Sequence, residues 1–264
     1  MNKYSFRFEE AWARKGLLLQ FFIRDLKIKY KNSVLGVFWS LLSPILIVTI
    51  YTLVFSVIMR FQTSYPYPLF LLAVWLPWQF MQTSLVLAST IFIEHGDLMN
   101  KIYFPRIYLP LANLLTNLVN FFISMIIFFI VREIYAIPFS KTMLLFPAVI
   151  IIHLIFSLGL NLIIASGTVF FRDLRYFLDI FLLLWFFSSP VIYGIEMVPQ
   201  WLLKFYLLNP FASIAVLYRT ILLSASIGPQ VYWAFLISAG WAISSLYLGI
   251  LIFYRYENAI VKEL

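Results

Sequence analysis

The feature that most constrains the fold is a series of long apolar stretches that carry almost no charged residues. The hydrocarbon core of a bilayer is about 30 Å thick, so an α-helix needs about 20 apolar residues to cross it. Five stretches reach that length, and a sixth follows a Gly-Pro break at 228–229. We therefore predict an all-α polytopic membrane protein with six transmembrane helices. The predicted spans are 34–58, 69–93, 107–131, 144–170, 176–195 and 230–254.

Composition excludes several other classes of protein. The 264 residues are 63% hydrophobic and only 11% charged, whereas a soluble domain has about 25% charged residues. An ordinary soluble enzyme, a disordered chain and a fibrous protein are therefore excluded. The chain has no cysteine, which excludes disulfides, thiolate metal sites and a cysteine nucleophile. The net charge of +8 would suggest nucleic acid in a soluble protein, but its distribution here indicates a membrane surface and no nucleic acid.

The stretch 196–227 is apolar but interrupted. Lys204, Asn209-Pro210 and Arg219 divide it into pieces that are too short to span a bilayer. Two short helices that enter the membrane and return fit this pattern better than a seventh span does. We predict a re-entrant helical hairpin over 196–227, with its break at Asn209-Pro210.

The distribution of lysine and arginine predicts the orientation. With six spans and a cytoplasmic N-terminus, 14 of these residues fall on the cytoplasmic side and five on the other. A seventh span would reduce this asymmetry to 12 against six, and the positive-inside rule favours the larger bias. Both termini are therefore expected in the cytoplasm. The predicted organisation is a cytoplasmic segment over 1–33, one membrane domain over 34–254 and a cytoplasmic tail over 255–264.

The segment before the first span is predicted to contain an amphipathic interface helix over 17–31. One face carries polar and basic residues, namely Gln20, Arg24, Lys27 and Lys31. The opposite face carries apolar residues, namely Leu19, Phe22, Ile23 and Leu26. Such a helix lies on the cytoplasmic leaflet with its cations beside anionic headgroups. It could serve as a membrane anchor or recruit a negatively charged substrate.

The connection between the second and third spans is predicted to form a short cytoplasmic helix. Gly96 permits a turn, Asp97 suits an N-cap, and the helix has to end before Pro105. A partner's groove could accept this helix through three apolar anchors, Leu98, Met99 and Ile102. A solvated surface helix without a partner is the alternative.

No arrangement typical of an enzyme is found in the sequence. Only two histidines occur, and His153 stands alone in the fourth span, which is typical of a buried, hydrogen-bonded side chain. Paired carboxylates, metal-ligand spacings and a phosphate-binding P-loop are absent from the sequence. We predict no catalytic residue, no metal ligand and no cofactor in this chain. If ATP drives transport, a separate polypeptide has to bind it.

Aromatic residues make up 20% of the chain. Many of them lie in mid-span, where interfacial belts do not explain them. Aromatic rings suit the C–H faces and hydroxyl rims of sugars, so a glycan could slide along them, but ordinary helix packing is the alternative. The candidate channel-lining residues are Phe38, Trp39, Tyr51, Phe55, Trp185 and Phe186.

Several segments together resemble the permease subunits of type-2 ABC exporters that move lipid-linked polysaccharides. The resemblance is closest to O-antigen export permeases, with teichoic-acid and capsule exporters as relatives. The matching segments keep the order of the family: 24–39, Pro44, 101–106, 171–174, 189–193, 209–210 and 254–257.

This resemblance implies a homodimer in the bacterial inner membrane, with an ATP-binding subunit that carries ATP and Mg²⁺ docked on the cytoplasmic side. It implies a polyprenyl-pyrophosphate-linked polysaccharide as the cargo. The implied coupling helix comprises Asp97, Leu98, Met99, Lys101, Ile102 and Tyr103. Arg24, Lys27 and Lys29 would lie where the lipid-linked substrate enters. The implied periplasmic gate contains Pro190, Tyr193, Asn209 and Pro210.

Three other functions remain open at this point. The same architecture could export a drug or another lipid. An intramembrane glycan-lipid enzyme would need converging carboxylates or a metal site, and the sequence offers neither. A structural scaffold would tolerate the loss of the positive charges at Arg24 and Lys27.

Overall fold

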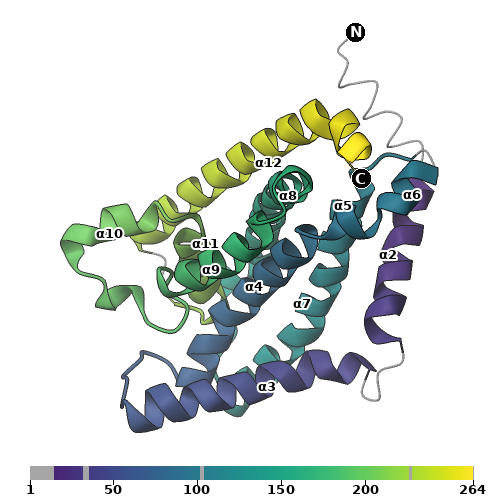
Figure 1. The fold of residues 1–264 in the computed structure, drawn as a ribbon. Helices are drawn as coiled ribbons and strands as arrows, with labels where there is room; N and C mark the ends of the chain where they lie inside the picture. The colour runs from purple at the N-terminus through teal and green to yellow at the C-terminus, as the bar shows by residue number, and fades with distance from the viewer. Residues whose placement is uncertain (1–14, 32–35, 102–103, 226–227, 264) are drawn as a thin grey trace.

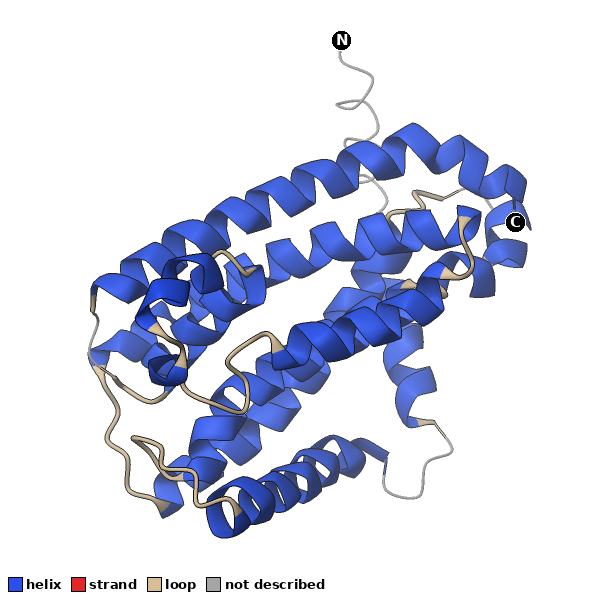
Figure 2. Ribbon diagram, turned by 60° about the vertical axis from the view of Figure 1, so that its left-hand side comes forward, coloured by secondary structure: helices blue, strands red, loops and turns tan. Residues whose placement is uncertain are grey.

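The computed structural model describes residues 15–31, 36–101, 104–225 and 228–263 (Figure 1). Within these ranges the chain is helical and contains no strand, as Figure 2 also shows. This confirms the predicted all-α class.

Within the residues that the structure describes, five helices are long and apolar enough to cross a membrane. They cover Gly36–Ile58, Tyr67–Ala88, Tyr108–Ile134, Lys141–Phe170 and Pro229–Ile260. Each overlaps one of the predicted spans, because a charge-free apolar run of this length has few alternatives to a membrane helix. The exact number of spans, predicted as six, stays a prediction.

The first and fourth of these spans are composite. The first joins η1 (Gly36–Phe38), α3 (Trp39–Tyr51) and η2 (Thr52–Ile58), where η2 has π-helical hydrogen bonding. The fourth joins η3 (Lys141–Leu145) to α8 (Phe146–Phe170). In Figure 1, α3 lies across the lower end of the molecule.

Two helices end at residues other than the ends of the predicted spans. The second span, α4 (Tyr67–Ala88), ends before 93, because the hydroxyls of Ser89 and Thr90 bond back to carbonyls of the preceding turn. The short helices α5 (Ile91–Glu94) and α6 (Gly96–Lys101) follow it. At the other end of the chain, α12 (Pro229–Glu263) continues as a helix through most of the predicted tail.

The prediction of a continuous helix over 176–195 is wrong. The helix formed there, α9 (Leu174–Phe187), has 14 residues and is about 21 Å long, which is less than the thickness of a bilayer core. It ends at Ser188, whose hydroxyl donates to the carbonyl of Leu184. Pro190 follows after Ser189, and its ring disfavours a helical conformation at Ser189.

The interrupted stretch forms two helices with the predicted break. Helices α10 (Gln200–Leu207) and α11 (Pro210–Leu222) meet at an angle of 101°. Asn209 caps α11, because its Oδ1 accepts from the backbone N–H groups of Phe211 and Ala212. A proline at the first helical position, as at Pro210, completes a favourable start.

Helix α8 and helix α12 lie side by side along most of α8 (Figures 1 and 2). Their backbones touch at Gly159, where an added Cβ would lie 2.2 Å from the backbone carbon of Ser245. Gly249 meets the backbone of Gly159 in the same contact. Small residues that allow such close approach are a common means of packing helices within a bilayer.

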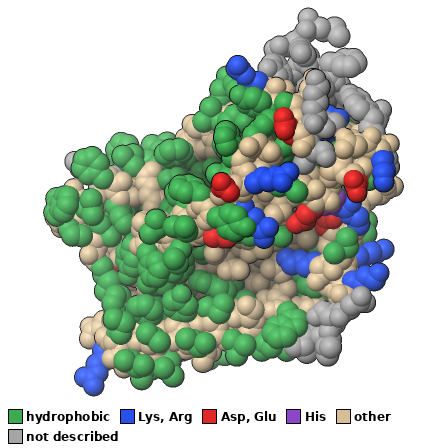
Figure 3. Space-filling model, viewed as in Figure 1, with side chains coloured by type: hydrophobic (Ala, Val, Ile, Leu, Met, Phe, Trp, Pro, Cys, Tyr) green, Lys and Arg blue, Asp and Glu red, His purple; other side chains and the backbone are tan. Residues whose placement is uncertain are grey.

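Helix α7 (Tyr108–Ile134) lies beside α4 at the centre of the molecule. The start of α7 and the end of α12 are joined by an ion pair between Arg106 and Glu257, with 3.5 Å between Nη1 and Oε1. Helix α2 (Lys15–Tyr30), α6 and the C-terminal end of α12 lie at this same end of the molecule (Figure 1). Charged side chains gather over it in Figure 3, and we call it the charged end.

Helix α2 lies along the first part of α7, which offers polar side chains to which the end of α2 bonds. Phe21 is buried, whereas Leu19 and Ile23, predicted to face the lipid, are exposed. The placement of α2 on a membrane surface stays a prediction.

Candidate functional site

At the charged end, a hydrogen bond joins α2 to the turn before α6. The Arg24 guanidinium lies 2.8 Å from Nε2 of His95 and also forms an ion pair with Asp25. Nδ1 of His95 lies 2.9 Å from the carbonyl oxygen of Ile91, which can only accept. His95 is therefore protonated on Nδ1 and accepts at Nε2 from Arg24. The rings of Phe21 and Phe104 pack beside this contact at 5.1 Å.

The predicted docking helix forms as α6, but its apolar side chains turn inward. Met99 is 4% exposed and packs in a cluster with Phe21 and Phe92, and Leu98 packs against the same cluster. Met99 is therefore not available as an anchor for a partner, contrary to expectation. Asp97 and Lys101 are exposed. Ile102 and Tyr103 lie outside the described residues.

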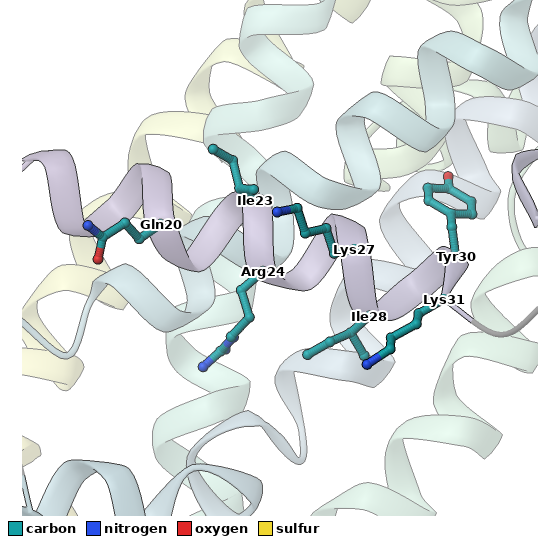
Figure 4. A pocket seen from close by; sticks show the side chains of 7 residues that line it. All are labelled: Gln20, Ile23, Arg24, Lys27, Ile28, Tyr30 and Lys31. Carbon is teal, nitrogen blue, oxygen red and sulfur yellow. The ribbon is translucent and has the colours of Figure 1, made fainter.

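The outer side of α2 forms an open, basic groove of 760 Å³ (Figure 4). It is lined by Gln20, Ile23, Arg24, Lys27, Ile28, Tyr30 and Lys31. In Figure 4, Arg24, Ile28 and Lys31 project to one side of α2. Two of the three predicted substrate-contacting cations, Arg24 and Lys27, thus share this basic groove.

The third cation, Lys29, points the other way, into the molecule. Its Nζ donates to Oδ1 of Asn117 at 3.1 Å, and the residue as a whole is exposed. Burial lowers the pKa of the Lys29 ammonium group. Asn117 in turn donates to Asn113, which donates to the carbonyl of Ser84, so a chain of buried polar contacts leads from α2 through α7 to α4.

Next to Lys29 lies a cavity of 270 Å³ between α2, α3, α4 and α7, which we call the polar groove. Its polar lining residues include Lys29, Tyr30, Ser40, Ser43, Gln79, Thr83 and Asn120. Its aromatic lining residues are Trp39, Trp75, Phe80 and Phe121. Oδ1 of Asn120 accepts from the hydroxyls of Tyr30 and Ser40, which fixes three helices around the groove.

The predicted gate residues come together in one cluster at the α9 to α11 turn. Oδ1 of Asn209 accepts from the Trp185 indole at 2.7 Å, and its Nδ2 donates to the carbonyl of Ser188 and the hydroxyl of Ser189, next to Pro190. The Tyr193 hydroxyl contacts that of Tyr206 at 2.7 Å and donates to the carbonyl of Phe187. Their role as a gate stays a prediction.

Sequence reasoning missed the part that Arg219 plays in this cluster. Its guanidinium donates to the carbonyls of Val191 and Tyr193, both at 3.1 Å, and its Cζ lies 3.8 Å from the ring centre of Phe70. A cation in an apolar stretch can indicate a buried role, but in the sequence Arg219 indicates only an interruption of the stretch and a positive charge.

Arg132 was missed in the same way. It is fully buried at the end of α7, where it donates to the carbonyls of Ile137, Pro138 and Leu222 and to the hydroxyl of Ser224. Carbonyls at helix C-termini carry partial negative charge and suit a cation. His153, by contrast, is the buried side chain that the sequence predicts, with its Nδ1 3.2 Å from the hydroxyl of Tyr218.

The six candidate channel aromatics lie in three separate places within one chain. Trp39 lines the polar groove and Phe38 is exposed beside it. Tyr51 stacks on Phe55 at 5.8 Å. Trp185 and Phe186 pack on Trp78. Their common role as a channel lining stays a prediction.

Comparison with known proteins assigns the family. Residues 17–223 match the family model of the ABC-2 type transporter. The chain belongs to the ABC-2 type transporter family. It is 34% identical to the O-antigen export system permease protein RfbA of Myxococcus xanthus over 214 residues. This alignment covers 80% of the chain and 82% of the RfbA protein. It is 29% identical to the protein of the same name from Klebsiella pneumoniae over 240 residues. This alignment covers 89% of the chain and 91% of the Klebsiella protein.

As a member of the ABC-2 type transporter family, the chain is a polytopic membrane permease. The matched segment begins in α2 and ends just after α11, so it includes the basic groove, α6, the polar groove and the gate cluster. Among the described residues, no group of His, Asp and Glu could hold a metal ion.

Proposed function

We propose that this chain is the permease subunit of an ABC exporter that moves a polyprenyl-pyrophosphate-linked, O-antigen-like polysaccharide from the cytoplasm to the periplasm. The observation that carries this proposal is the similarity to O-antigen export permeases over 80 to 89% of the chain. The basic groove supports it, because clustered cations beside a membrane suit the pyrophosphate of a lipid carrier.

A separate ATP-binding subunit would supply the energy and hold ATP and Mg²⁺. Helix α6 is the proposed contact, through its exposed Asp97 and Lys101 in place of the buried Met99. The hydrogen bond between His95 and Arg24 supports this assignment, because it would transmit a displacement of α6 to α2.

The working unit would be a homodimer in the bacterial inner membrane, with both termini in the cytoplasm. Only 11% of the most apolar 18-residue window of the first span is buried within the chain, and α9 buries a single stripe of Leu178, Leu182 and Phe186. The remaining apolar faces of these two helices are available to lipid or to a second copy.

The test is export in a bacterial strain that lacks this chain and its ATP-binding partner. Restoring both is expected to return the polysaccharide to the cell surface, whereas the permease with an ATPase-inactive partner leaves lipid-linked polysaccharide inside the cell. Removal of 97–103 should abolish export and copurification of the partner. Normal export without an active partner, or export of a hydrophobic drug in place of the glycan, would contradict the proposal.

A further inference from the structure

The polar groove contains unused hydrogen-bonding groups about midway along α4 and α7. Nδ2 of Asn120, Oε1 of Gln79 and the indole N–H of Trp39 have no hydrogen-bond partner among the described residues. Polar groups that face hydrocarbon without partners are unfavourable by several kcal/mol each. A groove with this much free capacity therefore suits water or a hydroxylated ligand better than a lipid tail.

The groove also places flat rings beside these polar groups. Trp39 is half exposed, and Trp75 and Phe80 form part of the wall. Sugars present C–H faces that stack on such rings and hydroxyl rims that need donors and acceptors in the plane of the sugar. With 270 Å³, the groove lies below the range of about 300 to 1,000 Å³ of drug-sized pockets. It suits a ligand of about one sugar residue.

Lys29 gives the groove one cationic end. Its ammonium group uses one donor on Asn117, and within the described residues it forms no ion pair with a carboxylate. Tyr30 lines both the polar groove and the basic groove, so the two are adjacent at the end of α2. A ligand that carries a phosphate next to a hydroxylated ring would match a cationic end followed by polar and aromatic groups.

We propose that the polar groove binds the sugar residue next to the phosphate of the lipid-linked glycan, while the basic groove of α2 takes the phosphate. This inference rests on the proposed function and adds a sugar-recognition site to it. Gln79 and Asn120 would bond to the sugar hydroxyls, and Trp39 would cover one face of the ring.

The proposal can be tested by direct binding to the full-length chain in phosphatidylcholine nanodiscs. Three probes are needed: polyprenyl pyrophosphate alone, the same carrier with one glucose or one N-acetylglucosamine, and phosphatidylglycerol. The wild-type chain is expected to bind one of the two sugar-bearing carriers at least about fivefold more tightly than the bare carrier, which corresponds to one net hydrogen bond.

Gln79→Leu and Trp39→Leu should each remove this difference and leave the affinity for the bare carrier unchanged. The matched controls are Gln230→Leu and Trp233→Leu on α12, which replace exposed side chains of the same type outside the groove. Both controls should retain the wild-type preference. Because Trp39 is 50% exposed and Trp233 63% exposed, these two substitutions test the site and not the fold.

The outcomes separate the two proposals. If the wild-type chain binds the bare and sugar-bearing carriers equally, or if the groove variants keep the preference, the sugar site is wrong while the exporter proposal stands. If phosphatidylglycerol competes as well as the sugar-bearing carrier, the groove is an ordinary headgroup site. If neither carrier binds more tightly than phosphatidylglycerol, the proposed function fails, and the sugar site fails with it.

Discussion

Arg219 illustrates how a single charged side chain can organise an apolar region. Its guanidinium holds the carbonyls of Val191 and Tyr193, which follow the end of α9, from a position on α11. Those two carbonyls accept no hydrogen bond from a helix N–H group, because they follow the end of α9. The planar guanidinium of Arg219 supplies a donor to each of them. Phe70 covers the guanidinium and keeps it away from hydrocarbon.

Arg219→Lys should destabilise the protein although it preserves the charge. A lysine has no planar fork and stacks less well on Phe70, so the free energy of unfolding is expected to fall by about 2 kcal/mol. Unfolding of the purified chain in mixed micelles, followed by tryptophan fluorescence, measures this change. Arg172→Lys, at an exposed position, is the matched control. Equal stability of the two variants would contradict the role assigned to Arg219.

Residue types alone predict some of these sites and not others. His153 could be predicted as a buried, hydrogen-bonded residue, because an isolated imidazole in an apolar run has few other options. Arg132 and Arg219 could not be placed, because each has partners that only the fold brings near, such as the carbonyls of Leu222 and Tyr193. Every residue has a backbone carbonyl, so the sequence does not show which carbonyl will accept a hydrogen bond.

At the scale of the element, hydropathy predicts which segments form membrane-spanning helices but not the residues at which these helices end. The run 69–93 contains no charged residue, and the end of α4 at Ala88 depends on two hydroxyls that bond to the backbone. For the run 176–195, hydropathy likewise does not predict the helix end at Ser188, before Pro190. Polar break residues such as Asn209 are easier to recognise, because capping has a known side-chain preference.

The contact between α8 and α12 yields a sharp prediction for one glycine. Gly159→Ala would place a methyl group against the backbone of Ser245, and neither backbone can yield without separating the helices. We expect a loss of about 1 to 3 kcal/mol in the free energy of unfolding, as for overpacked cores. Unfolding in mixed micelles again provides the measurement.

Gly240→Ala provides the control for the Gly159→Ala substitution. Nothing lies within 4 Å of an added Cβ at Gly240, so alanine there should leave stability unchanged or raise it slightly through better helix propensity. If both alanine variants behave alike, the close approach of α8 and α12 is not a determinant of stability.

At the scale of the whole molecule, the charged end and the gate cluster lie on opposite parts of the bundle. Helix α2, α6 and the end of α12 form one region, held together by the contacts of Arg24 with His95 and of Arg106 with Glu257 (Figures 1 and 3). The positive-inside asymmetry in the sequence predicts that this region faces the cytoplasm. The resemblance to polysaccharide exporters implies the same orientation.

The natural absence of cysteine makes this orientation directly testable. Single cysteines at the exposed positions Asp97 on α6 and Glu263 at the end of α12 should be blocked by a membrane-impermeant maleimide only after the inner membrane is opened. A cysteine at Lys141, which precedes α8 at the other end of the bundle, should react in intact spheroplasts. The exposure of all three side chains removes burial as the cause of any difference. Labelling of Asp97→Cys from outside would place α6 beyond the reach of a cytoplasmic ATPase, and coupling through α6 would then be physically impossible.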